Sequence, residues 1–171
     1  MSGEGGDKFT NLGKFAWEIL KNNRPSVNTD ADYVNAIPAA ANWADLSAPH
    51  GTNHFEWKWV GPGWFIHDFE FEMMISWTYG ARWRGGGAYI TNAVVTVTDY
   101  NVGVGGYDIR IAARVGNIEN GGTETAPYPR IPIDVGYSYS NWLYGGGGTC
   151  RFLVSGNGAG HADYDDSARD V

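Results

Sequence analysis

Three carboxylates in one short stretch have a spacing that acid–base catalysis could use. Asp68, Glu70 and Glu72 occupy alternate positions of DFEFEMMISWTY. On a β-strand they would share one face, about 6.6 Å apart from one to the next, and crowded carboxylates raise one another's pKa until one can act as a general acid. The solvent-facing side of any strand requires the same alternation of polar and apolar residues. We therefore predict that Glu70 and Glu72 are not a catalytic pair.

A second candidate is the sequence ARWRGGGAY, in which two arginines flank a tryptophan. Arg82 and Arg84 could hold an anion or a lipid headgroup, with Trp83 stacking beside it. Gly85 to Gly87 could form a phosphate cradle only if a helix followed, and the sequence after them has the pattern of a strand. The simpler interpretation is the tip of a β-hairpin, where positive φ angles favour glycine.

Other reactive residue types give no site. His50 and His54 have a spacing that brings zinc ligands together on a helix, but Gly51 and Thr52 between them favour a turn. Cys150 alternates with apolar residues, which predicts a buried thiol rather than a nucleophile. We expect no catalytic residue, no metal and no cofactor.

The elements that position these residues follow from a period of two in the apolar residues after Gly51. The pattern covers HFEWKWV, FEFEMMISWTY, YDIRIAARV and IPIDVGYSY, and AYITNAVVTVTDY and CRFLVS complete about six strands. Clean alternation over consecutive strands is typical of antiparallel sheets with one face in water. The sequence therefore predicts a mainly β fold, an antiparallel β-sandwich or barrel.

An amphipathic helix is predicted before these strands, at residues 9–22, because its apolar residues follow the helical period and Pro25 lies just beyond its end. Residues 26–51, with scattered Pro, Asn and Ala, are predicted as a long connection with at most a turn of helix. The β-sandwich is expected at 52–156 and a solvated acidic tail at 157–171. All four parts are expected to belong to a single domain spanning residues 1–171.

The charge balance argues against several partners. Lys and Arg number 12 against 19 Asp and Glu, for a net charge of −7, and no basic run is present. Nucleic acid and strongly anionic membranes are therefore disfavoured. The N-terminus lacks the pattern of a signal peptide, and no run approaches the roughly 18 apolar residues of a membrane-spanning helix. We expect a protein that is soluble when made, with export by a route without a classical signal peptide left open.

The aromatic excess is the strongest functional signal. The chain has 8 Trp, 10 Tyr and 7 Phe, and those on apolar strand faces are expected in the core. Others lie in segments bounded by Gly or Pro, which predicts exposed loops: Trp64, Trp83, Tyr128, Trp142 and Tyr144. Loop aromatics suit docking on a sugar ring or a membrane interface, because the ring is apolar in its body and polar at its edge. We predict that they form a binding surface.

The segment FTNLGKFAWEILKN, followed by aromatic-rich antiparallel strands, resembles the layout of actinoporin-type cytolysins. YSYSNWLYGG, residues 137–146, is similar to their aromatic headgroup-binding loop. The resemblance implies a water-soluble monomer that docks on lipid, oligomerises and inserts its helix. It implies headgroup contacts by Tyr137, Tyr139, Trp142 and Tyr144. It also implies a membrane-inserting helix that contains Phe9, Leu12, Phe15, Ala16, Ile19 and Leu20.

Three classes of function stay open. The first is a non-enzymatic protein that docks on lipid headgroups or glycans and forms homo-oligomers, such as a pore-forming cytolysin. The second is a lectin-like or self-assembling structural subunit. The third is a small jelly-roll glycoside hydrolase using Glu70 and Glu72, since the acidic strands of that family resemble DFEFE. Leakage from vesicles would favour the first class, glycan binding without leakage the second, and pH-dependent sugar release the third.

Overall fold

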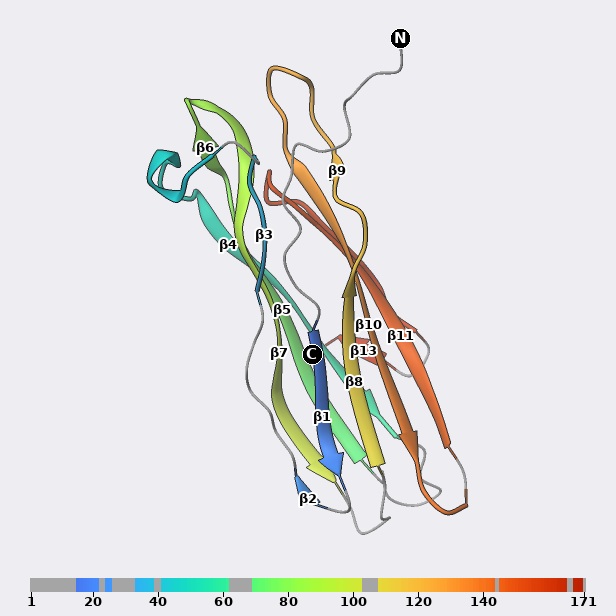
Figure 1. Ribbon diagram of the computed structural model, residues 1–171. Helices are drawn as coiled ribbons and strands as arrows, with labels where there is room; N and C mark the ends of the chain where they lie inside the picture. The colour runs from blue at the N-terminus through green and yellow to red at the C-terminus, as the bar shows by residue number, and fades with distance from the viewer. Residues whose placement is uncertain are drawn as a thin grey trace.

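The computed structural model describes residues 15–21, 24–25, 33–38, 41–61, 69–102, 108–143, 145–165 and 168–170. Within these ranges, it describes the backbone alone for residues 15–21, 24–25, 33–34, 43, 102 and 168–170. The described residues form two antiparallel sheets, one layered on the other along the length of the molecule (Figure 1). The prediction of a mainly β, antiparallel fold is confirmed.

Sheet 1 is built around the long β10–β11 hairpin. Its strands, in spatial order, are β12 (Gly160–Asp163), β11 (Gly145–Ser155), β10 (Pro129–Ser140), β8 (Asp108–Val115), β1 (Phe15–Lys21) and β2 (Arg24–Pro25), with β9 (Glu119–Asn120) beside β10. β10 and β11 pair without interruption from Arg130 and Ser155 to Ser140 and Gly145. The hairpin therefore closes between Ser140 and Gly145, and residues 141–143 are the described part of its connection.

Sheet 2 is built around β4, β5 and β7. Its strands, in spatial order, are β13 (Ala168–Asp170), β4 (Gly51–Val60), β5 (Phe69–Tyr79), β7 (Gly86–Val102) and β3 (Tyr33–Ala36), with β6 (Ala81–Trp83) beside β7. A 3-10 helix, η1 (Trp43–Asp45), precedes β4. The glycine-rich turn predicted at Gly85 to Gly87 is confirmed between β6 and β7: Trp83 pairs with Gly86, and Arg84 and Gly85 both have positive φ.

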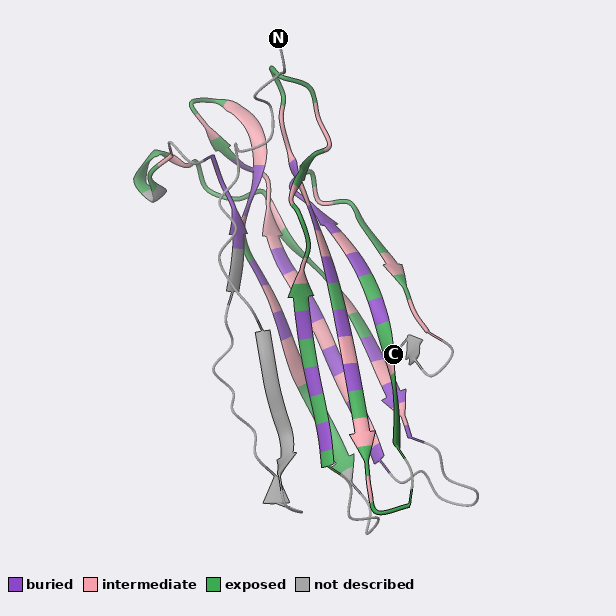
Figure 2. Ribbon diagram, turned by 45° about the vertical axis from the view of Figure 1, so that its right-hand side comes forward, coloured by how far each residue is buried: buried purple, intermediate pink, exposed green. Residues whose placement is uncertain are grey.

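The core lies between the two sheets and follows the period of two. Along β8, β10 and most of β5, every second residue is buried and its neighbours are exposed or half-buried (Figure 2). Aromatic rings then make the contacts between the sheets. Trp57 of β4 meets Phe152 of β11 with ring centroids 4.5 Å apart, and Trp59 meets Tyr137 of β10 at the same distance.

The helix predicted at residues 9–22 is not supported. Phe15–Lys21 is strand β1, which pairs with β8 from Phe15 opposite Ala113 to Leu20 opposite Ile109; the rest of the predicted helix lies outside the described residues. FAWEILK satisfies a period of two as well as the helical period, and the free edge of β8 supplies hydrogen-bond partners for its backbone. Within the described part of the chain, no helix is long and apolar enough to cross a membrane.

Two other segments differ from the predictions. The connection predicted at 26–51 contains β3, although η1 fits the expected turn of helix. The segment predicted as an acidic tail contains β12 and β13, which pair with β11 and β4. Local sequence does not reveal any of these three strands, because each is short and gains its hydrogen bonds from the exposed edge of a longer neighbour.

The inter-sheet contact of Trp57 predicts a large effect on stability. Trp57→Ala should lower the free energy of unfolding by about 3–5 kcal/mol, because a fully buried ring is lost between the sheets. Trp57→Phe should cost less, since the indole N–H of Trp57 has no acceptor among the described residues. Urea unfolding followed by circular dichroism measures both changes. Leu143→Ala is the control, and an equal loss in that variant would contradict the assignment of Trp57 to the core.

Candidate functional site

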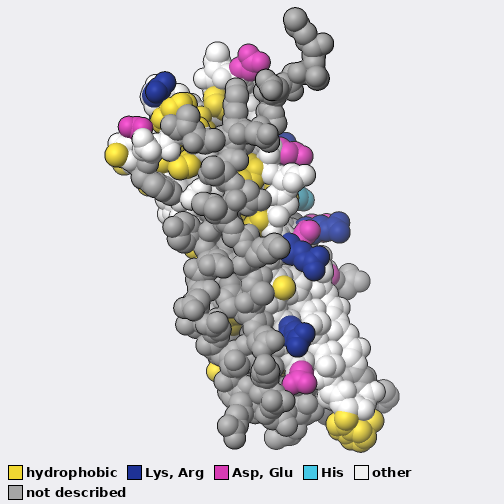
Figure 3. Space-filling model, viewed as in Figure 1, with side chains coloured by type: hydrophobic (Ala, Val, Ile, Leu, Met, Phe, Trp, Pro, Cys, Tyr) yellow, Lys and Arg dark blue, Asp and Glu magenta, His cyan; other side chains and the backbone are white. Residues whose placement is uncertain are grey.

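The connection between β10 and β11 carries the two most exposed large hydrophobic residues among those described. Trp142 is 86% exposed and Leu143 is 63% exposed. The Asn141 side-chain oxygen accepts a hydrogen bond of 2.8 Å from the Leu143 N–H, which fixes the turn. Figure 3 shows a group of hydrophobic side chains at the end of the molecule where this connection lies. We call Trp142 and Leu143 the hairpin tip.

The hairpin behind this tip carries no charge. From Val135 to Cys150 the sequence contains no Asp, Glu, Lys, Arg or His. The uncharged part is bounded by Asp134 and Arg151, which are directly opposite each other and form an ion pair with 3.6 Å between Oδ1 and Nε. An uncharged stretch that ends in exposed Trp and Leu can enter an apolar or interfacial environment without desolvating a charge.

Tyr137 and Tyr139, expected to contact headgroups, face the core. Tyr137 is only 7% exposed and Tyr139 is half-buried, and the two rings stack 6.1 Å apart. They pair across the hairpin with Gly148 and Gly146, where a Cβ atom would lie 2.9 Å from the ring of Tyr137 or 2.7 Å from the hydroxyl of Tyr139. The prediction for Tyr137 is therefore wrong: its side chain faces the interior, where it fills the space left by a glycine.

Trp83, Arg82 and Arg84 lie at the tip of the β6–β7 hairpin, away from Trp142. Trp83 is half-buried, and the Arg84 guanidinium lies over its ring, 4.5 Å from the centroid. The Arg82 backbone N–H donates to Ser47 Oγ. Arg82 and Arg84 are exposed, but Trp83 does not present an open ring to a ligand, because its own neighbour stacks on it.

The other predicted aromatics do not join the hairpin tip. Tyr128 is half-buried beside β9. Trp64 and Tyr144 lie outside the described residues, as do Phe9 and Leu12 of the predicted membrane-inserting helix, and for Phe15, Ala16, Ile19 and Leu20 only the strand backbone is described. The described part of the predicted binding surface is thus reduced to Trp142, and Leu143 is the member that the sequence analysis missed.

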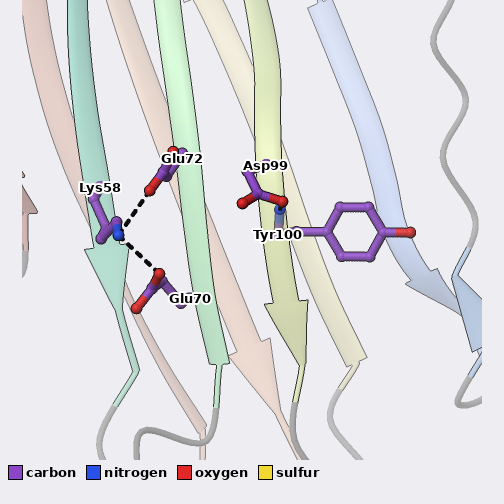
Figure 4. Close-up of polar contacts among 5 residues, drawn as sticks. All are labelled: Lys58, Glu70, Glu72, Asp99 and Tyr100. Carbon is purple, nitrogen blue, oxygen red and sulfur yellow. Dashed lines mark hydrogen bonds and ion pairs between the residues drawn. The ribbon is translucent and has the colours of Figure 1, made fainter. Parts of the chain in front are cut away.

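Glu70 and Glu72 share the outer face of β5, as the period predicts, and both bind one lysine. Lys58 of β4 lies with its Nζ 2.8 Å from Glu70 Oε1 and 2.7 Å from Glu72 Oε1 (Figure 4). These contacts raise the pKa of Lys58 well above its ordinary value. One cation between two carboxylates relieves their mutual repulsion. Unrelieved repulsion between crowded carboxylates is the condition that would create a general acid. Asp68 lies outside the described residues.

The thiol and the two histidines considered in the sequence do not form a site among the described residues. Cys150 is fully buried, and burial raises the pKa of its thiol to about 11, so it is protonated at neutral pH. His50 and His54 are exposed. Among the described residues, no group of three His, Cys, Asp or Glu side chains could hold a metal ion.

A shallow hollow of about 520 Å³ lies on the outer face of sheet 1. Its floor includes the small residues Ala112, Gly136 and Thr149, which stand side by side across β8, β10 and β11. Arg110 and Arg114 lie at its two sides. Tyr137 and Gly148, which alternate with these residues along β10 and β11, also border the hollow, although the Tyr137 side chain is buried in the core.

The contact between Tyr137 and Gly148 predicts that β11 cannot carry a side chain at this position. Gly148→Val should lower the free energy of unfolding by about 1–3 kcal/mol, because the new side chain meets the Tyr137 ring and the Asp165 carboxylate. Thermal unfolding with near-ultraviolet circular dichroism measures the loss. Thr149→Val, an exposed neighbour, is the matched control and should change stability by less than about 0.5 kcal/mol. A fully stable Gly148→Val would rule out this packing.

The Lys58 contacts predict a pH dependence at alkaline pH. Because the pKa of Lys58 is raised in the folded protein, its contribution is fully present below 10.5, the ordinary value, and is lost as pH rises further. Lys58→Met should therefore lower the melting temperature at neutral pH, and the difference from the unsubstituted protein should shrink only in strongly alkaline buffer. Arg151→Met is the control, because arginine does not titrate there. A difference that disappears before pH 10.5 would refute a raised pKa.

Comparisons with protein-family models, with curated proteins and with solved structures found no match for the chain. The resemblance to actinoporin-type cytolysins stays a prediction.

Proposed function

We propose that the two sheets form a β-sandwich that acts as a non-enzymatic docking module, attaching to a lipid membrane surface through the hairpin tip. The observation that carries this proposal is the exposure of Trp142 and Leu143, 86% and 63%, at the end of an uncharged hairpin. Trp is favoured at membrane–water interfaces, where its apolar body and polar N–H are both accommodated.

The hairpin tip supports weak, reversible attachment. Transfer of the exposed Trp and Leu side chains out of water would contribute on the order of 5 kcal/mol, at about 25 cal/mol per Å² of apolar surface. That free energy corresponds to a roughly millimolar dissociation constant, before the cost of immobilising the protein is included. Stable attachment would then need more than one tip on the same membrane, which is consistent with the homo-oligomer expected from the sequence.

The chemistry of the tip favours lipid over glycan. Sugar-binding sites combine a flat ring with side chains that hydrogen-bond hydroxyl groups, whereas Trp142 has the aliphatic Leu143 beside it. The side-chain oxygen of Asn141, the nearest amide, already accepts the Leu143 N–H. The net charge of −7 and the uncharged hairpin favour zwitterionic over anionic lipid.

The proposal covers docking and self-association, and it does not include membrane insertion by a helix. That insertion was expected from residues 9–22, of which Phe15–Lys21 is strand β1. The ion pairs of Lys58 with Glu70 and Glu72 support a non-enzymatic function, because they give these carboxylates a structural role on the outer face of sheet 2.

Trp142→Ala tests the proposal. This variant should bind phosphatidylcholine vesicles more weakly by about 1–3 kcal/mol, with no change in melting temperature, because an exposed anchor is truncated. Co-sedimentation with vesicles measures binding, and added salt should change it little, since the tip carries no charge. Tyr100→Ala, which removes an aromatic 39% exposed on β7, is the matched control.

Three outcomes would overturn docking through the tip. The unsubstituted protein would fail to bind neutral vesicles, Tyr100→Ala would weaken binding as much as Trp142→Ala, or the protein would bind glycans on an array in a Trp142-dependent way without binding vesicles. The last outcome would assign the tip to a lectin-like function.

A further inference from the structure

The outer face of sheet 1 combines small side chains with charges of alternating sign. One row across the sheet consists of Ala112, Gly136 and Thr149, which lie in the floor of the 520 Å³ hollow. The rows next to it along β10 and β11 contain Ser138 with Gly147, and Asp134 with Arg151. Because these side chains are small, the centre of the face is low, and the hollow lies there.

The charged row crosses four strands with strictly alternating sign. Arg114 of β8 is opposite Asp134 of β10, Asp134 is opposite Arg151 of β11, and Arg151 is opposite Asp163 of β12. All four residues are exposed. Although the chain has a net charge of −7, this row has as many positive as negative charges, so two copies meeting here would not repel each other.

We propose that this face binds the same face of a second copy of the chain, around a two-fold axis that runs roughly along β10 and β11. Rotation about this axis reverses the order of the strands across the sheet, so β10 of one copy lies over β11 of the other. It leaves the position of each residue along the strand direction unchanged. Each arginine of the charged row then faces an aspartate: Arg114 faces Asp163 of the second copy, and Asp134 faces its Arg151. A two-fold interface brings together the same patch from both copies, and self-complementary charge is what it requires.

The other rows fit the same arrangement. Pro132 and Leu153, opposite each other in the hairpin and both half-buried, give an apolar contact between copies. Thr149 of each copy lies over Gly136 of the other and enters the hollow above it, and Ser138 lies over Gly147. Sheets that pack face to face are rotated by about 30° relative to each other, so the best contacts lie near the axis.

The size of the face makes this dimer weak. Four strands about 4.8 Å apart and roughly 25 Å of strand length cover on the order of 500 Å² per copy, or about 1,000 Å² in total. That is at the low end of specific protein interfaces, so the association is reversible and depends on concentration.

The two-fold axis also bears on the proposed function. Because it runs along the hairpin, it places both hairpin tips at the same end of the dimer, where they can reach one membrane together. Two weak tips held together bind far more tightly than one, through the high effective concentration of the second. This consequence depends on the proposed docking to membranes, whereas the dimer itself does not.

Sedimentation velocity across the micromolar range tests the dimer, with Ser138→Glu as the disrupting variant. Ser138 is exposed and lies across from Arg110 in its own sheet, so a glutamate there is compatible with the folded monomer. In the dimer, the glutamates of the two copies would bring bulk and two like charges to the centre of the interface. The unsubstituted protein should show a reversible monomer–dimer equilibrium, and Ser138→Glu should remain monomeric with an unchanged melting temperature. Thr52→Glu, an exposed position on β4 of sheet 2, is the matched control and should dimerise normally.

Charge reversal provides a second test. Asp134→Arg should reduce the dimer at least tenfold, because the introduced arginine would then face Arg151 of the second copy, and the exchange Asp134→Arg with Arg151→Asp should restore it. The proposal is wrong if the unsubstituted protein is monomeric throughout, if Ser138→Glu dimerises like the control, or if the exchanged pair fails to restore the dimer. Trp142→Ala should dimerise normally, so loss of vesicle binding in that variant bears on the docking function alone.

Discussion

The structure depends most on the packing of two tyrosines over a glycine strand. β11 begins with four consecutive glycines, which would weaken an isolated strand because they have no side chains to pack and lose much conformational entropy on folding. Tyr137 and Tyr139 of β10 lie across from Gly148 and Gly146 and fill the space that those residues leave. The same rings contact Trp59 and Phe69 of the other sheet, so they connect the end of the hairpin to the core.

This packing separates the two kinds of aromatic residue in the chain. Rings on inner strand faces make the contacts between the sheets, as Trp57 does with Phe152. Trp142 lies beyond the last pair of the hairpin, where no strand of the other sheet covers it among the described residues. The charges follow the same division: Lys58 is bound by Glu70 and Glu72 on the outer face of sheet 2, and Asp134 and Arg151 mark the point where the uncharged end of the hairpin begins.

Much of the fold could be predicted from the sequence because alternation is a local property. The alternation within FEFEMMISWTY and YDIRIAARV predicts the residues of β5 and β8 that are buried, and the positive φ at Arg84 and Gly85 agrees with the predicted glycine-rich turn between β6 and β7. The failures involve information that is not local. FAWEILK fits two periods, and only the free edge of β8 decides between them. The headgroup contact of Tyr137 was implied by the resemblance alone, and its packing partner Gly148 is eleven positions away, beyond the reach of the strand pattern in IPIDVGYSY. Lys58 can be matched with Glu72 only when the register of β4 and β5 is known.

The glycines of β11 have a consequence for the hairpin tip. A Cβ at Gly146 or Gly148 would meet a tyrosine side chain, and one at Gly145 would lie 2.9 Å from the carbonyl oxygen of Tyr139. The glycine tract is therefore a strand in which close neighbours leave no room for larger side chains. It is not a flexible linker. Trp142 and Leu143 are presented by a paired hairpin up to Ser140 and Gly145, with the turn fixed by Asn141. A site that is ordered before binding loses less entropy on binding, so in the proposed docking function even two exposed side chains could contribute most of their burial energy.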